Sequence, residues 1–143
     1  MELRAHLGWV GGVVAGWNFF WSLRMKPNFQ DPAVIVTKMY DATLWILPKV
    51  EKFPRSYRFT VGDRIATTSL SVLTLLVQAA YAKKRLTLIA EACNQLNSLR
   101  YLLRLAKDLK LMSTDSYLFI MEKIEELGRM AGGWQRQSGS TEE

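Results

Sequence analysis

The sequence predicts an all-α protein built as a bundle of four helices. Three observations support this prediction. Apolar residues recur at spacings of three and four over long stretches after residue 31, as expected for helices that each bury one face. Proline or a small polar residue precedes most of these stretches, and the breaks between them are short. A chain of 143 residues, 49% of them hydrophobic, is long enough to bury one core without disulfides or metals.

We expect three segments along the chain. Residues 1–25 form an apolar, glycine-rich extension that is uncharged over residues 7–23. This stretch is short for a membrane span, and Glu2 weakens the cationic start that a signal peptide needs, so we expect a cytoplasmic protein without a membrane partner. The extension is interpreted as a loosely attached arm or a misassigned start, with a membrane anchor as the alternative. Residues 26–137 form the four-helix bundle, and the polar residues 138–143 form a disordered tail.

The first helix is expected to start at Asp31 as N-cap, with Pro32 at the first helical position, where its missing N–H costs nothing. Its apolar residues continue to Pro48, which should bend or end it. Residues 53–58 are predicted to form a connecting loop.

The second helix, expected over residues 61–81, begins with Thr60 and Asp63 at the spacing of a capping box. It carries no charged residue between Ile65 and Ala82. Its polar side chains fall in one narrow strip, made of Thr67, Ser71, Thr74 and Gln78. A surface helix of a monomer should show a wider polar face, so we expect this helix to be covered on most sides. An interface between subunits is the favoured interpretation; a central helix of a monomer and a membrane span are the alternatives.

Lys83, Lys84 and Arg85 mark a tight connection, and the third helix is expected to run from about there to Lys110, without proline or glycine. Its apolar stripe is expected to shift after Leu96, so that its two halves pack against different neighbours. The expected stripe consists of Leu86, Ile89, Cys93 and Leu96, followed by Leu99, Leu102, Leu105 and Leu109. The fourth helix follows Ser113, a good N-cap, and should break at Gly132 and Gly133.

The residue types needed for catalysis or metal binding do not occur in a usable arrangement. His6, the single histidine, lies in the extension, so serine and cysteine nucleophiles have no histidine base in the bundle. Cys93 is the single cysteine, which excludes an intrachain disulfide. The glutamates of the fourth helix lie outside its apolar stripe, as on a solvated face. We therefore expect no enzyme activity, no catalytic residue, no metal and no cofactor.

Basic residues dominate the charge pattern, with a net charge of +6. Arg100, Arg104 and Lys107 fall at i, i+4 and i+7 and share one side of the third helix. Solvated helices normally alternate the signs of their charges, so this bias favours contacts with the phosphates of a nucleic acid. The candidate nucleic-acid or protein-binding residues are Arg55, Arg58, Arg64, Lys83, Lys84, Arg85, Arg100, Arg104, Lys107 and Lys110.

Two other interpretations of the basic residues stay open. They could form a merely soluble basic face, or an all-helical enzyme could use the arginines to grip a small carboxylate. The aromatic residues Tyr57, Phe59 and Tyr101 lie among the basic ones and could stack on unpaired bases, although aromatic residues more often pack in a core.

A family likeness rests on three segments: Phe53–Ile65 (FPRSYRFTVGDRI), Leu99–Leu109 (LRYLLRLAKDL) and Gly128–Trp134 (GRMAGGW). Their order and spacing resemble those of the accessory variability determinant proteins of diversity-generating retroelements. The likeness extends from about Pro27 to Gln137. These proteins are similar in turn to the four-helix-bundle proteins encoded in intervening sequences of bacterial ribosomal RNA genes.

The resemblance implies an up-down four-helix bundle that assembles into a barrel-like homopentamer with a basic surface. It implies binding to the element's reverse transcriptase and to template RNA or its DNA copy, without a catalytic role, in support of mutagenic retrohoming. The expected contact residues carried over by position are Arg55, Arg58, Arg64, Arg100, Arg104 and Lys107, some of which could instead make salt bridges between subunits. The alternative is an RNA-binding protein of the intervening-sequence type without a reverse transcriptase partner.

Overall fold

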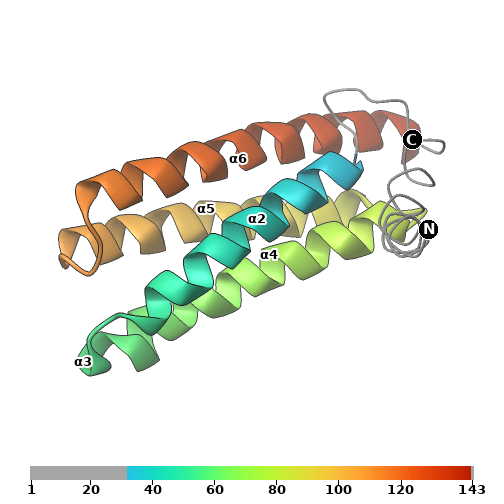
Figure 1. Cartoon of the computed structure of the whole chain (residues 1–143). Coiled ribbons are helices and arrows are strands. Elements are labelled where there is room, and N and C mark those ends of the chain that lie inside the picture. Colours follow the sequence, from blue (N-terminus) through green and yellow to red (C-terminus); the bar gives the residue numbers. More distant parts are fainter. Residues whose placement is uncertain (1–31, 143) are drawn as a thin grey trace, which may run out of the picture.

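The computed structural model describes residues 32–142, which form four long helices packed against one another (Figure 1). The elements are α2 (Pro32–Glu51), α3 (Arg55–Tyr57), the π-helical turn η1 (Arg58–Gly62), α4 (Asp63–Tyr81), α5 (Leu86–Asp108) and α6 (Thr114–Glu142). The predictions for residues 1–25, and for Asp31 as an N-cap, lie outside the described residues.

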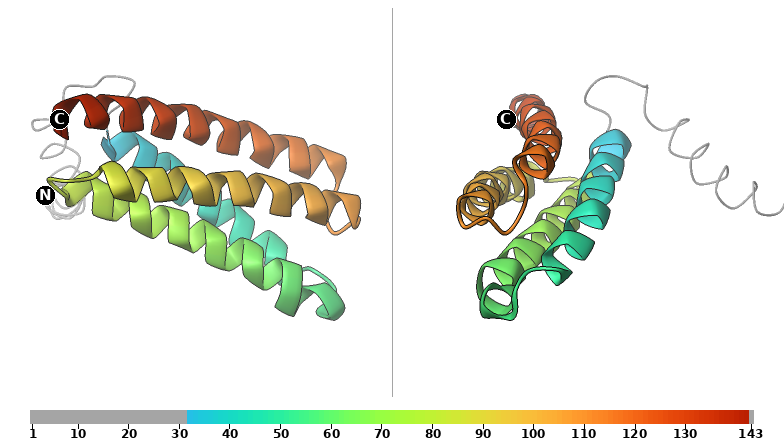
Figure 2. Two further views of the ribbon diagram at one scale, coloured as in Figure 1. Left: turned by 180° about the vertical axis from the view of Figure 1, so that it is seen from behind. Right: turned by 60° about the vertical axis from the view of Figure 1, so that its left-hand side comes forward.

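The four long helices alternate in direction, as in an up-down bundle (Figure 1). Helix α2 packs against α4 and α6, and α5 packs against the same two helices, so α2 and α5 lie on one diagonal and α4 and α6 on the other. The two hairpins, α2 with α4 and α5 with α6, diverge toward the end that carries α3 (Figure 2). The predicted set of four packed helices is confirmed.

The core runs along the axis of the bundle, because each long helix buries residues at spacings of three and four. The buried apolar side chains are Ile35, Met39, Ala42, Ile46 and Val50 of α2, Ile65, Val72, Leu76 and Ala79 of α4, Ile89, Ala92, Leu96, Leu99, Leu103 and Ala106 of α5, and Ile120, Ile124, Leu127, Met130, Ala131 and Trp134 of α6. Phe53, between α2 and α3, closes this core at the α3 end.

The buried stripe of α5 runs straight along the helix, and the predicted shift after Leu96 is wrong. Leu103 and Ala106 continue the stripe, whereas Leu105 and Leu109 are exposed. The second half of α5 is apolar on two adjacent stripes, so periodicity alone leaves the choice open. The packing of α5 between α4 and α6 selects one of them.

Helix α2 continues through Pro48 to Glu51, so of the two outcomes predicted for Pro48, a bend or an end of the helix, the end does not occur. The hydrogen bond that proline cannot donate would run to the carbonyl of Leu44, one turn earlier. Leu44 and Pro48 are both exposed, so water can satisfy that carbonyl.

The connection predicted as a loop is largely helical. The Pro54 carbonyl accepts hydrogen bonds from the amides of Tyr57 and Arg58, both at 2.9 Å, and η1 leads directly into α4. The predicted capping box does not form, because the helical chain leaves no free helix end at Thr60. The Thr60 hydroxyl instead donates to the Tyr57 carbonyl at 3.3 Å.

Helix α5 ends at a left-handed residue, and α6 begins at a serine cap. Lys110 has φ 62°, its amide donates to the Lys107 carbonyl, and the Leu111 amide donates to the Ala106 carbonyl, which is a Schellman arrangement. The Ser113 Oγ accepts a hydrogen bond from the Ser116 amide at 3.1 Å, which confirms the predicted cap.

Helix α6 passes through Gly132 and Gly133 without a break and continues to Glu142. The prediction of a break here, and of a disordered tail over residues 138–142, is wrong. Trp134 and Ser138 are buried against the bundle, and tertiary burial outweighs the cost of about 1 kcal/mol for each helical glycine. Residue 143 lies outside the described residues.

Candidate functional site

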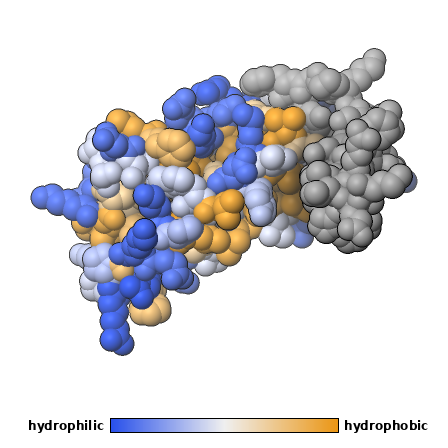
Figure 3. Space-filling model, viewed as in Figure 1, coloured by the Kyte–Doolittle hydropathy of each residue, from blue (hydrophilic) through white to orange (hydrophobic). Residues whose placement is uncertain are grey.

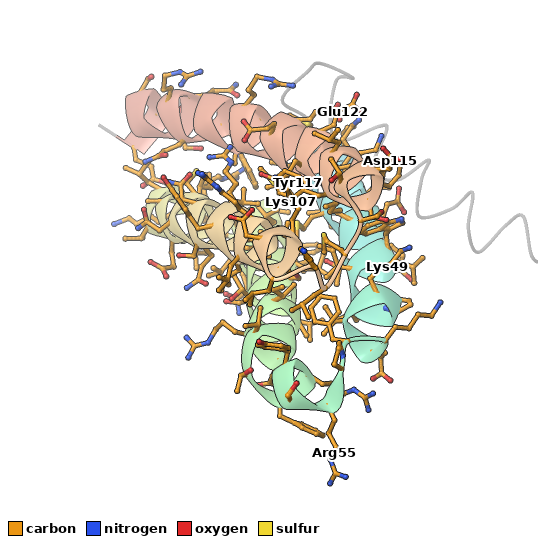
Figure 4. The ribbon with its side chains drawn as sticks, turned by 90° about the vertical axis from the view of Figure 1, so that its left-hand side faces the viewer. Lys49, Arg55, Lys107, Asp115, Tyr117 and Glu122 are labelled. Carbon is orange, nitrogen blue, oxygen red and sulfur yellow. The ribbon has the colours of Figure 1, made fainter. Side chains whose placement is uncertain are left out.

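The predicted binding residues fall into three groups in the structure. They are Arg55, Arg58 and Arg64 around α3 and η1; Lys83, Lys84 and Arg85 in the turn between α4 and α5; and Arg100, Arg104, Lys107 and Lys110 along and after α5. Figure 4 views the bundle from the α3 end and shows Arg55 and Lys107 at this same end. The turn between α4 and α5 lies at the opposite end (Figure 1).

Arg100 holds α5 against α6. Its Nε lies 3.0 Å from Glu125 Oε1, and its Nη1 donates to Asn97 Oδ1 at 2.5 Å. The guanidinium lies over Gly128 of α6, where the Cβ of any other residue would collide with it. With 27% of its side chain exposed, Arg100 is mainly an interhelical contact within one subunit.

Arg104 and Lys107 share one acidic neighbour. Arg104 Nε lies 3.9 Å from Asp108 Oδ2, and Lys107 Nζ lies 3.7 Å from Asp108 Oδ1. Lys107 also lies over the ring of Tyr117 in α6, with its Nζ 5.2 Å from the ring centre. The side that carries Arg100, Arg104 and Lys107 is therefore turned in part toward α6, and Arg104 is the most exposed of the three.

The turn between α4 and α5 contains one arginine that contacts α6 and two exposed lysines. The Arg85 guanidinium lies 5.8 Å from the centre of the Trp134 ring. The amides of Arg85 and Leu86 both donate to Glu142 Oε1, at 2.7 and 3.2 Å, so a carboxylate from α6 caps the N-terminus of α5. Lys83 and Lys84 are exposed and form no ion pair with any described residue.

The basic corner, residues 55–64, presents exposed arginines at the α3 end. Arg55 and Arg64 form no ion pair within residues 32–142, and Figure 4 shows Arg55 pointing away from the bundle. Arg58 is exposed as well, but its Nε and Nη2 donate to the Phe53 carbonyl, each at 3.3 Å. Arg58 therefore also ties the corner to the end of α2.

Gly62 allows the corner to lie close to α2. A Cβ at this position would lie 3.0 Å from Val50 Cγ1 and 3.4 Å from Phe53 Cδ2, closer than most side chains approach. Val50 and Phe53 are both buried, so η1 packs directly on the end of the core. The backbone of the basic corner is thus held by packing and hydrogen bonds.

The aromatic residues that accompany the basic ones are exposed. Phe59 in the basic corner is 69% exposed and Tyr101 on α5 is 72% exposed, so neither packs in the core of this chain. Tyr57 is 36% exposed. Phe59 follows Arg58 directly in η1, whereas Tyr101 follows Arg100, which is paired with Glu125.

Sequence reasoning missed an aromatic and cationic cluster between α2 and α6. The Trp45 and Phe119 rings lie 5.3 Å apart, centre to centre. Lys49 lies over Trp45 at 5.1 Å, and Lys123 lies over Phe119 at 5.4 Å. Each lysine follows its aromatic partner by four residues, a helical spacing that predicts these pairs, but nothing in the sequence brings Trp45 next to Phe119.

Within residues 32–142, the surroundings shift the pKa of two groups, Cys93 and Glu126. Burial raises the pKa of the Cys93 thiol, and nearby Arg100 only partly opposes this effect, so the thiol stays protonated near neutral pH. A hydrogen bond from Lys38 Nζ to Glu126 Oε1, at 2.7 Å, is the main cause that lowers the pKa of Glu126. Within the described residues, no group of three or more histidine, cysteine or acidic side chains is placed to hold a metal ion.

Helix α4 presents an uncharged surface on the side that faces away from α6. Leu70, Val77 and Tyr81 are exposed there, together with Thr67 and Thr74. Within residues 32–142, no other helix covers this side of α4. Figure 3 shows hydrophobic residues exposed among hydrophilic ones on the face that carries α2 and α4. None of the described helices is both long and apolar enough to cross a membrane.

A family model described as bAvd-like matches residues 33–138, which covers α2 from its second residue, all of α3 to α5 and most of α6. Neither a curated protein nor a solved structure matches the chain.

Proposed function

The chain belongs to the bAvd-like family, the bacterial accessory variability determinants, and from this membership we propose that it serves a diversity-generating retroelement. This family consists of non-catalytic accessory proteins. In our proposal the protein binds the element's reverse transcriptase and its template RNA or the DNA copy, and so supports mutagenic retrohoming. The match of the family model over residues 33–138 is the observation on which the proposal rests.

Exposed cations at both ends of the bundle support binding to a polyanion or to an acidic protein surface. Arg55, Arg64, Lys83, Lys84 and Lys110 are exposed and form no ion pair within residues 32–142. Cations without an acidic partner can contact phosphates without first breaking an internal ion pair. We therefore assign the first contacts to the ends of the bundle and to Arg104, and a supporting role to Arg100.

The uncharged surface of α4 supports assembly of several copies. Thr67, Leu70, Thr74, Val77 and Tyr81 are exposed along one side of a helix that has no charged residue between Ile65 and Ala82. Apolar surface of this kind is typical of contacts between subunits. We propose that this side of α4 is a subunit contact in a homopentamer.

Co-purification of the full chain with the reverse transcriptase of the proposed retroelement tests the proposed function. We expect a complex that contains several copies of this chain, as measured by light scattering of the complex and of the free protein. A soluble oligomer that binds RNA but never the polymerase would contradict the accessory role and would favour the intervening-sequence type of protein. A protein that binds neither would overturn both functions.

A further inference from the structure

We propose that the basic corner, residues 55–64, binds single-stranded nucleic acid, with the Phe59 ring stacked on an unpaired base and Arg55 and Arg64 on the flanking phosphates. The inference rests on the proposed function and deepens it, because it specifies which form of nucleic acid the basic surface binds. It also assigns that binding to one place in the bundle.

The first observation that supports this inference is the exposure of the Phe59 side chain. Its side chain is 69% exposed on a π-helical turn, although a phenylalanine has no polar group that water can solvate. π-Helical turns occur frequently at functional sites. The ring is thus available for a partner that offers a flat apolar surface, as a nucleobase does.

The charges around Phe59 indicate an anionic partner. Within residues 49–64 the basic side chains are Lys49, Lys52, Arg55, Arg58 and Arg64, against the acidic Glu51 and Asp63. Neither of these carboxylates lies within ion-pair distance of any of the five basic groups. A phosphate chain complements both the excess of positive charge and the lack of acidic partners for these groups.

Packing and hydrogen bonds also fix the backbone of the basic corner. Gly62 packs on Val50 and Phe53, and Arg58 fastens the turn to the Phe53 carbonyl. Little conformational freedom of the backbone has to be lost when a ligand binds, which favours affinity. Arg58 therefore acts as a positioning residue for Phe59.

A single strand fits this surface better than a duplex does. In a duplex the bases are stacked and paired, so an exposed aromatic ring cannot reach their faces. In a single strand the bases can turn outward and stack on aromatic side chains while the backbone follows the basic residues. The combination of one exposed ring with flanking arginines is therefore matched to unpaired bases.

Binding of the full chain to an oligouridine of about 20 nucleotides, and to a duplex RNA of equal length, tests the inference by fluorescence anisotropy. Phe59→Leu should weaken binding to the single strand about tenfold, the loss of one stacked base, and should leave duplex binding unchanged. Phe59→Trp should keep wild-type affinity. A double variant, Arg55→Ala with Arg64→Ala, should bind the single strand with a weaker dependence on salt. The slope of log K against log salt concentration should become shallower by about 0.7 for each phosphate contact that is lost.

Tyr40→Leu is the matched control, since Tyr40 is also an exposed aromatic residue, 55% exposed, but lies on α2 outside the basic corner; its affinity should not change. Circular dichroism and thermal unfolding confirm that each variant is folded. Equal losses for the single strand and the duplex, or a loss in Tyr40→Leu with none in Phe59→Leu, would overturn the inference. So would a Phe59→Leu variant that binds RNA normally but no longer binds the polymerase. If the wild type binds neither RNA, the nucleic-acid part of the proposed function fails as well.

Discussion

At the scale of single residues, the structure separates arginines that hold the bundle from arginines that face solvent. Arg100 is the clearest case of the first kind. Its guanidinium lies over Gly128, where a side chain would collide with it, and it reaches Glu125 and Asn97. Gly128 is therefore not a helix breaker but the space that lets α5 and α6 share this arginine.

We expect the effects of Gly128→Ala and Arg100→Ala to be strongly non-additive. In the Arg100→Ala background, Gly128→Ala should stabilise the protein by up to about 1 kcal/mol, because alanine favours the helix. In the wild type, the new methyl group would displace the guanidinium and break its contact with Glu125, so this gain should disappear or change sign. Urea unfolding of the four proteins in the cycle measures the coupling. Additive effects would contradict the contact.

At the scale of helices, one polar contact joins α2 to α6. Lys38 Nζ and Glu126 Oε1 lie 2.7 Å apart, and both side chains are partly exposed, 41% and 34%. This hydrogen bond is the largest of the causes that lower the pKa of Glu126. Because the pKa of Glu126 is lower in the folded state, folding favours the ionised carboxylate. The contribution of this contact to the free energy of unfolding should therefore decrease as the pH falls and Glu126 is protonated.

We expect Lys38→Met to destabilise the protein at pH 7 by about 0.5 kcal/mol, the usual contribution of a partly exposed pair. The contribution is present above the unfolded pKa of a glutamate, about 4.3, and is lost as the pH falls through the lower pKa of folded Glu126. The difference in free energy of unfolding between variant and wild type, measured with urea, should therefore be smaller at pH 3 than at pH 7. Glu126→Gln should reproduce this pattern, and an equal difference at both pH values would contradict it.

At the scale of the whole molecule, α4 has an exposed side that carries no charge between Ile65 and Ala82 and that no other helix within residues 32–142 covers. It contacts α2 and α5 but leaves Leu70, Val77 and Tyr81 exposed. Burial of such residues stabilises an assembly by roughly 25 cal/mol per Å² of apolar surface, whereas a charge placed among them would have to be desolvated.

If this side of α4 is the proposed subunit contact, Leu70→Glu should convert the proposed assembly to folded monomers, as measured by sedimentation velocity. Leu118→Glu is the matched control, because Leu118 is similarly exposed, 58% against 46%, but lies on α6, across the bundle from α4. The control should sediment as the wild type does. A Leu70→Glu variant that keeps the wild-type sedimentation coefficient would place the subunit contact elsewhere.

How far the sequence predicts the candidate site depends on the residue. The basic character of residues 55–64 follows from the sequence, and so does the presence of aromatic residues among them. Whether an arginine is paired depends on which helix lies opposite. Arg100 and Arg55 look alike in the sequence, yet only Arg100 meets a glutamate.

The sequence by itself determined the four helices, the Ser113 cap and the uncharged character of α4, because helical periodicity and capping depend on residues within one or two turns. Only the tertiary structure decided that Leu103 rather than Leu105 is buried, that α6 continues through Gly132 and Gly133, and that Trp45 meets Phe119. These outcomes depend on the neighbouring helix, which supplies the buried surface and the charge partners. Local propensities differ by only about 1 kcal/mol per residue, so contacts between helices decide wherever the local pattern leaves two choices open.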